Sequence, residues 1–338
     1  MMKSHNNYGI DLGTSTVKIF SQSKNRTISE QNMIAIREDL RVLAVGNEAY
    51  EMFEKTPENI TVNRPVRQGR IADIAEAEFV LRTLVQRLDS RVGRAPVFYF
   101  SAPVNMSKLE KQAYYEISHS GYLKNPLIYL VDRAICDAIA LGIPLTRTKG
   151  SMIVNIGGEN TEISVIANGQ VIISRDIPIG GHVLNEAIME AVLSHERLRI
   201  GHKTARRLKC VLASLGESSG ESRKVTGMDT VSGMPREKNI SADLVCYAVE
   251  GEMCHLAGEI NSFLNRMPPQ VFSAVTSDGI YLSGGSARIP NIDRYLRRSI
   301  GCEVNRSSYY ELCTVRGLEE LIQSDSLKKW AYTIRKKK

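Results

Sequence analysis

The chain has 338 residues, of which 43% are hydrophobic and 24% are charged. These proportions are those of ordinary globular proteins, and they exclude a disordered, collagen-like or coiled-coil chain of this length, which corresponds to roughly two domains. The 44 Lys and Arg against 37 Asp and Glu give a net charge of +7, which suits an anionic surface or a polyanionic ligand without requiring either.

The sequence also indicates a cellular compartment. It contains no apolar run near the ~18 residues of a membrane span, and no apolar signal region follows the N-terminus. The six cysteines are scattered without a C-x-x-C pair, which predicts reduced thiols rather than a zinc or disulfide framework. We therefore expect a cytoplasmic protein.

Short apolar or alternating runs bounded by Gly, Pro, Asn or Ser predict strands, and helical apolar periodicity appears between them. The predicted strands are Tyr8–Ile10, Thr16–Ser21, Pro96–Ser101, Leu127–Val131, Met152–Asn155, Ile163–Ile166, Val171–Asp176 and Gly279–Leu282. The predicted helices are Ala75–Asp89, Val183–His195, Lys203–Ser214, Leu244–Arg266 and Asn291–Ile300. Strands interspersed with helices favour α/β layers.

Two composition changes mark the organisation of the chain. Pro, Thr, Arg and Lys near Leu145–Gly150 separate a helix from a new strand and predict a domain boundary. The Gly- and Ser-rich stretch Gly216–Met234 predicts a flexible insertion.

A weak internal repeat relates the two halves. Gly9–Phe20 reads GIDLGTSTVKIF and Ile153–Ile166 reads IVNIGGENTEISVI. Each copy has a strand, an Asp or Asn, a glycine turn, a hydroxyl residue and a second strand. Two related hairpins suggest one ligand held between two halves.

The first hairpin offers a turn of the kind that holds phosphate, since glycine permits close approach and exposes backbone N–H groups. A lysine on the return strand can contact phosphate as a point charge, and an aspartate at the strand end can hold Mg²⁺ directly or through water. An ordinary hairpin with a solvent-facing lysine explains the same pattern. The candidate nucleotide-binding residues are Asp11, Gly13, Thr14, Ser15, Thr16 and Lys18, with Asp11 also the candidate Mg²⁺ ligand.

A third glycine turn lies near the C-terminus. Gly279–Pro290 reads GIYLSGGSARIP, so a strand meets Gly284, Gly285 and Ser286 before a helical pattern. Backbone N–H groups at such a turn can face a phosphate or a flat ring, and Arg288 can stack on a base. A tight strand-to-helix turn is the alternative.

These three segments resemble the phosphate-1, phosphate-2 and adenosine motifs of actin-like ATPases. Thr56–Asp73 (TPENITVNRPVRQGRIAD), Ser174–Ile188 (SRDIPIGGHVLNEAI) and Ile200–Leu215 are more specifically similar to the MreB family of bacterial actin-like rod-shape proteins. The resemblance runs in order from about Tyr8 to Leu321.

The resemblance implies an actin-like ATPase fold, in which two ribonuclease-H-like α/β halves surround a cleft for ATP and Mg²⁺. Domain I is expected over residues 1–145 with a small insertion at about 32–75. Domain II is expected over 146–338 with an insertion at about 183–256, and the last helix and basic tail (about 308–338) are expected to pack back on domain I.

The family implies protomers that form homopolymeric filaments at the inner, cytoplasmic face of the cell membrane and organise cell-wall synthesis and shape proteins. It assigns nucleotide contacts to a further set of positions, and it leaves two carboxylates as candidate catalytic residues. The added nucleotide contacts are Gly157, Gly158, Glu159, Asn160, Lys209, Gly284, Gly285, Ser286 and Arg288. The candidate catalytic residues are Glu162 and Asp132.

Three departures from the family pattern concern hydrolysis. Asn155 replaces the Asp that organises Mg²⁺-bound water, and Glu159 adds a carboxylate where the family has Gly. Arg133 replaces the Glu that positions the attacking water, and arginine cannot accept a proton. Losing one such group costs roughly a hundredfold in rate, unless Asp132 or Glu162 takes over. We expect nucleotide binding with doubtful hydrolysis.

The C-terminus, SLKKWAYTIRKKK, contains the only tryptophan of the chain and a cluster of lysines. In a helix, four apolar residues would share one face at i, i+3, i+4 and i+7, as in an interfacial membrane anchor. A last helix packed on the body with a frayed basic end is equally consistent. The candidate membrane residues are Leu327, Trp330, Ala331 and Ile334.

Three functions are compared on these grounds. A cytoskeletal ATPase that polymerises on the membrane is the first, and a nucleotide-binding scaffold with little or no turnover is the second. A small-molecule kinase on the same fold is disfavoured because no acceptor-binding insertion with a catalytic Asp is recognisable. Nucleic acid is not expected as a partner, since no recognition helix or aromatic-interleaved basic stripe occurs.

Overall fold

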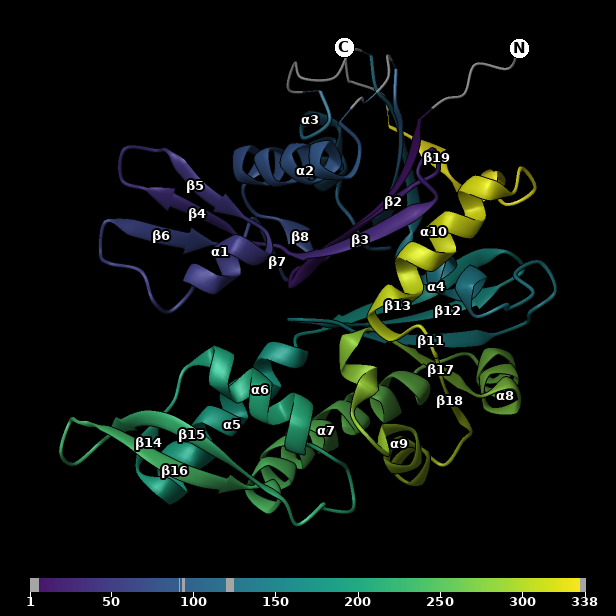
Figure 1. Cartoon of the computed structure of the whole chain (residues 1–338). Helices are drawn as coiled ribbons and strands as arrows, with labels where there is room; N and C mark the ends of the chain where they lie inside the picture. Colours follow the sequence, from purple (N-terminus) through teal and green to yellow (C-terminus); the bar gives the residue numbers. More distant parts are fainter. Residues whose placement is uncertain (1–5, 91, 93–94, 120–124, 335–338) are drawn as a thin grey trace. The chain divides into compact units, whose positions relative to one another are not determined.

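The computed structural model describes residues 6–90, 92, 95–119 and 125–334, and the chain divides into two compact units (Figure 1). Unit 1 comprises Met1–Thr148, Ser164–Arg175 and Glu311–Lys338. Unit 2 comprises Lys149–Ile163 and Asp176–Tyr310.

The main sheet of unit 1 has six strands in the order β19-β10-β9-β1-β2-β3. It is mixed, because β9 pairs in parallel with both β1 and β10, whereas β2 runs antiparallel to both β1 and β3. Its strands are β1 (Asn7–Leu12), β2 (Thr16–Ser21), β3 (Arg26–Gln31), β9 (Val97–Ala102), β10 (Leu127–Asp132) and β19 (Tyr332–Thr333).

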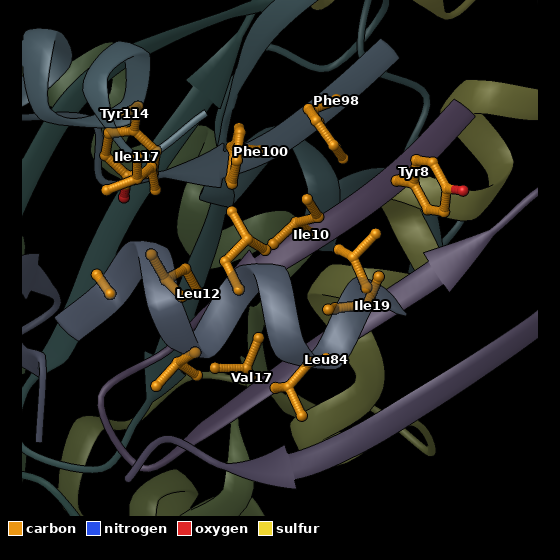
Figure 2. Packing of buried hydrophobic residues seen from close by; sticks show 14 of the residues in the cluster. Tyr8, Ile10, Leu12, Val17, Ile19, Leu84, Phe98, Phe100, Tyr114 and Ile117 are labelled. Carbon is orange, nitrogen blue, oxygen red and sulfur yellow. The ribbon is translucent and has the colours of Figure 1, made fainter. Parts of the chain in front are cut away.

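The alternation of side chains along β1 separates two layers. Tyr8, Ile10 and Leu12 are buried in one cluster with Leu84 of α2 (Ile74–Leu88), on the face that Figure 2 displays. Gly9 points the other way, where the position of a Cβ would lie only 3.0 Å from the Cβ of Leu318 in α10 (Cys313–Gln323). Since successive strand residues face opposite sides, Asp11 shares the face of Gly9.

Helix α10 also fixes α4 (Arg133–Ala140), which follows β10 directly. A side chain on Gly317 would collide with the backbone carbonyl of Cys136, so glycine permits the close helix contact. The hydroxyl of Thr314 donates to the buried carboxylate of Asp137 at 2.6 Å. These contacts hold the first residue of α4, Arg133, at the end of β10.

Smaller elements complete unit 1. A three-stranded sheet in the order β5-β4-β6 packs with α1 around Met33, Ala35 and Ala49. The remaining elements are β4 (Ile34–Arg37), β5 (Val42–Val45), α1 (Asn47–Met52), β6 (Ile60–Asn63), β7 (Val66–Arg67), β8 (Arg70–Ile71) and α3 (Lys108–Glu116).

The second large sheet has the order β13-β12-β11-β17-β18, with β17 parallel to both β11 and β18. Its strands are β11 (Ser151–Ile156), β12 (Thr161–Ala167), β13 (Gln170–Ile177), β17 (Ile280–Ser283) and β18 (Val304–Arg306). The helices of unit 2 are α5 (Gly181–Glu196), α6 (His202–Leu212), α7 (Ala242–Leu264), α8 (Pro269–Asp278) and α9 (Ile292–Ile300). The predicted strands and helices listed from the sequence all have counterparts among these elements.

The prediction of a flexible insertion over Gly216–Met234 is wrong for its second part. Strand β15 (Ser222–Asp229) lies within it and pairs with β16 (Pro235–Ser241), while β14 (Leu198–Arg199) completes a three-stranded sheet. Most of the β15 side chains are polar and exposed, with Val225 buried. The strand therefore lacks the apolar run that would have predicted it.

The C-terminal segment also differs from the expected amphipathic helix. Lys328–Trp330 form a single 3₁₀ turn, and β19 then pairs antiparallel with β10 at the edge of the sheet. The indole Nε1 of Trp330 donates to the carbonyl of Gly169 at 2.9 Å, and Ile334 packs against the unit 1 core. The free edge of β10 offers backbone partners that a helix would forgo, so the face shared by Leu327, Trp330, Ala331 and Ile334 does not form. The basic residues 335–338 lie outside the described residues.

Within the described ranges, no helix is long and apolar enough to cross a membrane.

Candidate functional site

The turn between β1 and β2 in unit 1 requires glycine at its centre. A Cβ on Gly13 would lie 2.8 Å from the carbonyl oxygen of Thr16. The amide of Asn32 donates to the Gly13 carbonyl at 2.7 Å, and the backbone N–H of Gly69 donates to the Thr14 hydroxyl oxygen at 2.9 Å. The turn is therefore held from two neighbouring loops, and the hydroxyl of Thr14 keeps its own proton to donate.

Asp11 and Lys18 face each other across the two strands. They are paired in the strand register, and the Nζ atom of Lys18 lies 3.0 Å from Oδ2 of Asp11. Ser101, at the parallel register position on β9, donates to Oδ1 at 2.8 Å. Burial would raise the pKa of Asp11, but Lys18, Arg133 and Ser101 together hold it below the ordinary 3.8.

This donor set does not fit a directly bound Mg²⁺. Mg²⁺ takes oxygen ligands, usually one or two carboxylates with waters and phosphate oxygens. Here both oxygens of Asp11 already have partners, and two cationic side chains act on the same carboxylate. Among the residues that the structure describes, no group of three or more His, Cys, Asp or Glu could hold a metal ion. The geometry gives no support to Asp11 as a metal ligand.

Asp132 and Arg133 diverge at the junction of β10 and α4. Asp132 accepts a hydrogen bond from the hydroxyl of Tyr332 at 3.4 Å, and burial raises the pKa of its carboxyl despite this bond and nearby Lys111. Arg133 is 8% exposed and lowers the pKa of Asp11 through its charge. The position nearest the first turn is therefore occupied by a cation, and the carboxylate beside it contacts the C-terminal strand.

In unit 2, the turn between β11 and β12 packs directly on the start of α5. A Cβ on Gly180 would lie 2.7–2.8 Å from the backbone of Gly158, Glu159 and Asn160. The backbone N–H of Gly181 donates to the carbonyl of Gly157 at 2.9 Å. The glycine pairs Gly157–Gly158 and Gly180–Gly181 therefore allow the β11–β12 turn to contact the N-terminus of α5. Backbone dipoles of both segments come close together there.

Several polar side chains lie on or near this turn. Nδ1 of His182 lies 3.3 Å from Oε1 of Glu159, and the amide of Asn160 donates to Asp176 at 3.4 Å. Glu162 is buried on β12, two residues beyond. The added carboxylate of Glu159 is therefore drawn toward the imidazole of His182.

Lys209 of α6 reaches the same helix start. Its Nζ atom donates to the carbonyl of Gly181, and both it and the Ser286 hydroxyl lie 3.2 Å from the Cβ position of that glycine. Burial, with a smaller contribution from Arg206 and against the effect of Cys210, lowers the pKa of Lys209 to about 8. Unit 2 thus brings together Lys209, Ser286 and the second glycine turn, as the resemblance implies for a nucleotide site.

The third glycine turn follows β17. Gly284 has a φ of 88°, a conformation that favours glycine, and any Cβ there would collide with the backbone of Ile156. Arg288 lies over the ring of Tyr310, 5.0 Å from its centre. The guanidinium expected to stack on a base therefore already stacks on a tyrosine.

Several contributors are not apparent from the sequence motifs alone. Ser101 donates to Asp11 from a separate strand, and Tyr310, the first residue of a short 3₁₀ helix, stacks with Arg288. Gly180 and Gly181 could have been identified as a Gly-Gly pair opening a helix, which is the same signal that marked Gly284.

Two mixed sheets with helices, each carrying a glycine turn after a buried strand, define an actin-like α/β protein. The MamK double helical filament shares this fold, with a TM-score of 0.77 at 20% identity over 94% of this chain and 99% of that one. The family model for the MreB/Mbl protein matches residues 5–329, and the chain therefore belongs to the MreB/Mbl family.

Individual relatives agree with this assignment. The cell shape-determining protein MreB of Escherichia coli is 30% identical over 321 residues, which cover 92% of each chain. The crystal structure of MreB5 of Spiroplasma citri bound to ADP has a TM-score of 0.89 at 26% identity, covering 96% of this chain and 98% of that one. The same protein bound to AMPPNP has a TM-score of 0.90 at 25% identity, over 97% and 98% of the two chains.

Proposed function

We propose that this chain is a cytoskeletal protein that binds ATP and polymerises into membrane-associated filaments, which support cell shape and organise cell-wall synthesis. Membership of the MreB/Mbl family supports this, since the relatives with this name are cell shape-determining proteins. The relatives of known structure bound to ADP and AMPPNP support a nucleotide as the ligand.

The observation that carries the nucleotide is the second glycine turn. Gly157 and Gly158 contact the start of α5, and Lys209 reaches the same point with a donor group. The first N–H groups of α5 donate to the carbonyls of this turn, so the support comes from the turn itself, since a glycine turn can present backbone N–H groups to phosphate, and a lysine beside it adds positive charge. The first turn, with Lys18, repeats this combination of a glycine turn and a buried cation.

A specific residue favours a second form of the proposal, a nucleotide-binding scaffold with little or no hydrolysis. Arg133 stands where the resemblance places a water-positioning Glu, and its charge acts on Asp11. A guanidinium cannot act as a general base. Glu162 and Asp132 remain the candidate catalytic carboxylates, although burial raises the pKa of Asp132.

The test is assembly of the purified full chain with ATP, with ADP and without nucleotide, followed by pelleting and negative-stain microscopy. We expect filaments that depend on nucleotide. A Gly284→Val variant serves as a site control, because a branched side chain cannot adopt the φ of 88° without strain. Filaments that form equally well without nucleotide would refute the nucleotide-dependent form of the proposal. If the protein stays in the supernatant in every condition, polymerisation is refuted.

Membrane association is proposed through charge rather than through an apolar helix face. The chain carries a net charge of +7 and ends in Lys336, Lys337 and Lys338, and each basic residue near an anionic surface adds about 1 kcal/mol. Replacing Lys337 and Lys338 with Gln should weaken co-sedimentation with anionic liposomes. Replacing Arg294 and Arg298, which are exposed on α9, removes the same charge elsewhere as a control. Equal binding by the two variants would refute a role for the tail.

A further inference from the structure

The ammonium of Lys18 is presented at the first glycine turn. Its Nζ atom lies 3.7 Å from the position where Gly13 would carry a Cβ, and 3.0 Å from Oδ2 of Asp11. The Lys18 and Asp11 side chains are only 8% and 6% exposed. A largely buried ammonium therefore lies beside Gly13, in the turn that the Thr16 carbonyl closes on its other side.

The two charged side chains that act on the Asp11 carboxylate are both positive. Asp11 contributes one negative charge, while Lys18 and Arg133 contribute two positive charges that both act on its carboxylate. A divalent cation entering here would meet repulsion from both side chains, and would share the Asp11 oxygens with the Lys18 and Ser101 hydrogen bonds. The negative charges of a polyphosphate would instead be attracted by Lys18 and Arg133.

The lysine also retains capacity to bind an anion. An ammonium has three N–H donors, and one of them is directed to Asp11. A compact ammonium is a common phosphate-binding group. Its position is fixed by the strand register with Asp11, so little side-chain freedom is lost when a phosphate binds.

We propose that the Lys18 ammonium takes the place of the divalent cation at this turn, so that the chain binds a nucleoside di- or triphosphate without needing Mg²⁺. This inference rests on the proposed nucleotide site. It reverses the expectation from the family, in which ATP is held together with Mg²⁺.

The experiment is calorimetric titration of the full chain with ADP and with AMPPNP, in excess EDTA and in excess Mg²⁺. Affinity in EDTA should equal that in Mg²⁺ within about threefold, because a charge-assisted hydrogen bond of a few kcal/mol is already supplied by the protein. In Lys18→Met, affinity in EDTA should fall about tenfold or more, and Mg²⁺ should restore part of it.

Lys24→Met is the matched control. Lys24 also pairs with a buried carboxylate, Asp89, at 3.7 Å, but its side chain is 50% exposed and follows β2 at the end away from the turn. Its affinity should match that of the unmodified chain in both buffers. If Lys18→Met fails to fold, the double variant Asp11→Asn/Lys18→Met, which removes both charges of this ion pair, takes its place.

The outcomes separate the two proposals. Binding that requires Mg²⁺ in the unmodified chain would overturn the inference and leave nucleotide binding intact. Equal Mg²⁺ independence in Lys18→Met would also overturn it, because another group would then supply the charge. No binding of either nucleotide in either buffer would refute the proposed function itself.

Discussion

Removing the Lys18 ammonium should destabilise unit 1 even without nucleotide. Lys18→Met keeps most of the side-chain length but leaves the buried Asp11 carboxylate without its ion-pair partner. Breaking a buried pair from one side costs about 3–5 kcal/mol. Ser101 and Arg133 still stabilise the carboxylate, so we expect a loss of about 3 kcal/mol in the free energy of unfolding at neutral pH.

The loss should depend on pH in a defined direction. In the unmodified chain the pKa of Asp11 lies below 3.8, so its stabilisation is present above that value and is lost as the pH falls through the lower folded-state pKa. In Lys18→Met the Lys18 charge is gone while burial remains, so the pKa of Asp11 should rise relative to the unmodified chain and protonation should relieve part of the loss. The difference between the two proteins should therefore shrink from pH 7 toward pH 4.5.

Tryptophan fluorescence during urea unfolding reports the stability of unit 1, which contains Lys18 and Asp11. Trp330 is the only tryptophan, and it donates to Gly169 within unit 1. Lys24→Met breaks an ion pair in which the lysine side chain is half exposed, so it should lower the free energy of unfolding by at most about 1 kcal/mol. The double variant Asp11→Asn/Lys18→Met should regain most of the stability that Lys18→Met loses. A Lys18→Met loss below 1 kcal/mol, or one that stays constant with pH, would refute this account of the pair.

Three further predictions concern packing and the second unit. Leu84→Ala should lower the free energy of unfolding by about 2–5 kcal/mol in the same fluorescence assay, because Leu84 is fully buried. Leu109→Ala, at a position that is 80% exposed, should change it by no more than about 0.5 kcal/mol. Equal losses in the two variants would contradict the assignment of the core. Gly284→Ala should weaken binding of ADP by calorimetry, since the new Cβ meets the Ile156 backbone, and unchanged affinity would show that this turn does not contribute. Burial lowers the pKa of Lys209 to about 8, so between pH 8 and 10.5 the unfolded chain binds more protons than the folded one and the free energy of unfolding should rise with pH. Unfolding followed by circular dichroism at several pH values should find a smaller rise in Lys209→Met. An unchanged slope in that variant would contradict the burial of the ammonium.

The fold was predictable where the residue pattern matches one secondary structure. The alternation of Tyr8, Ile10 and Leu12 and the helical spacing around Leu84 each admit one interpretation, and both elements are present. Strand β15 was missed because its side chains face solvent on most positions. The C-terminal segment was mistaken because β10 offers an open edge, and an edge of a distant strand leaves no mark in the local sequence.

The glycine turns of the candidate site were predictable from the sequence, whereas the contacts of its charged side chains were less so. The turns around Gly13, Gly157 and Gly284 follow from sequence, since glycine there is required by backbone contacts that are local or belong to adjacent strands. The pairing of Lys18 with Asp11 is readable in principle, because the two-strand register places them opposite each other. The stacking of Arg288 on Tyr310 was not predictable, because Tyr310 lies in a 3₁₀ helix that begins 22 residues further along the chain.

The central proposal is that the chain binds ATP in an actin-like fold, and its second form is that Arg133 suppresses hydrolysis. Single-turnover phosphate release, measured at saturating ATP on the unmodified chain, Arg133→Glu and Arg133→Gln, tests it most directly. The account predicts slow release from the unmodified chain and from Arg133→Gln, with a gain of roughly a hundredfold in Arg133→Glu, where a carboxylate can position water. Rapid release from the unmodified chain, unchanged in Arg133→Glu, would contradict it and assign the water-positioning role to Glu162 or Asp132.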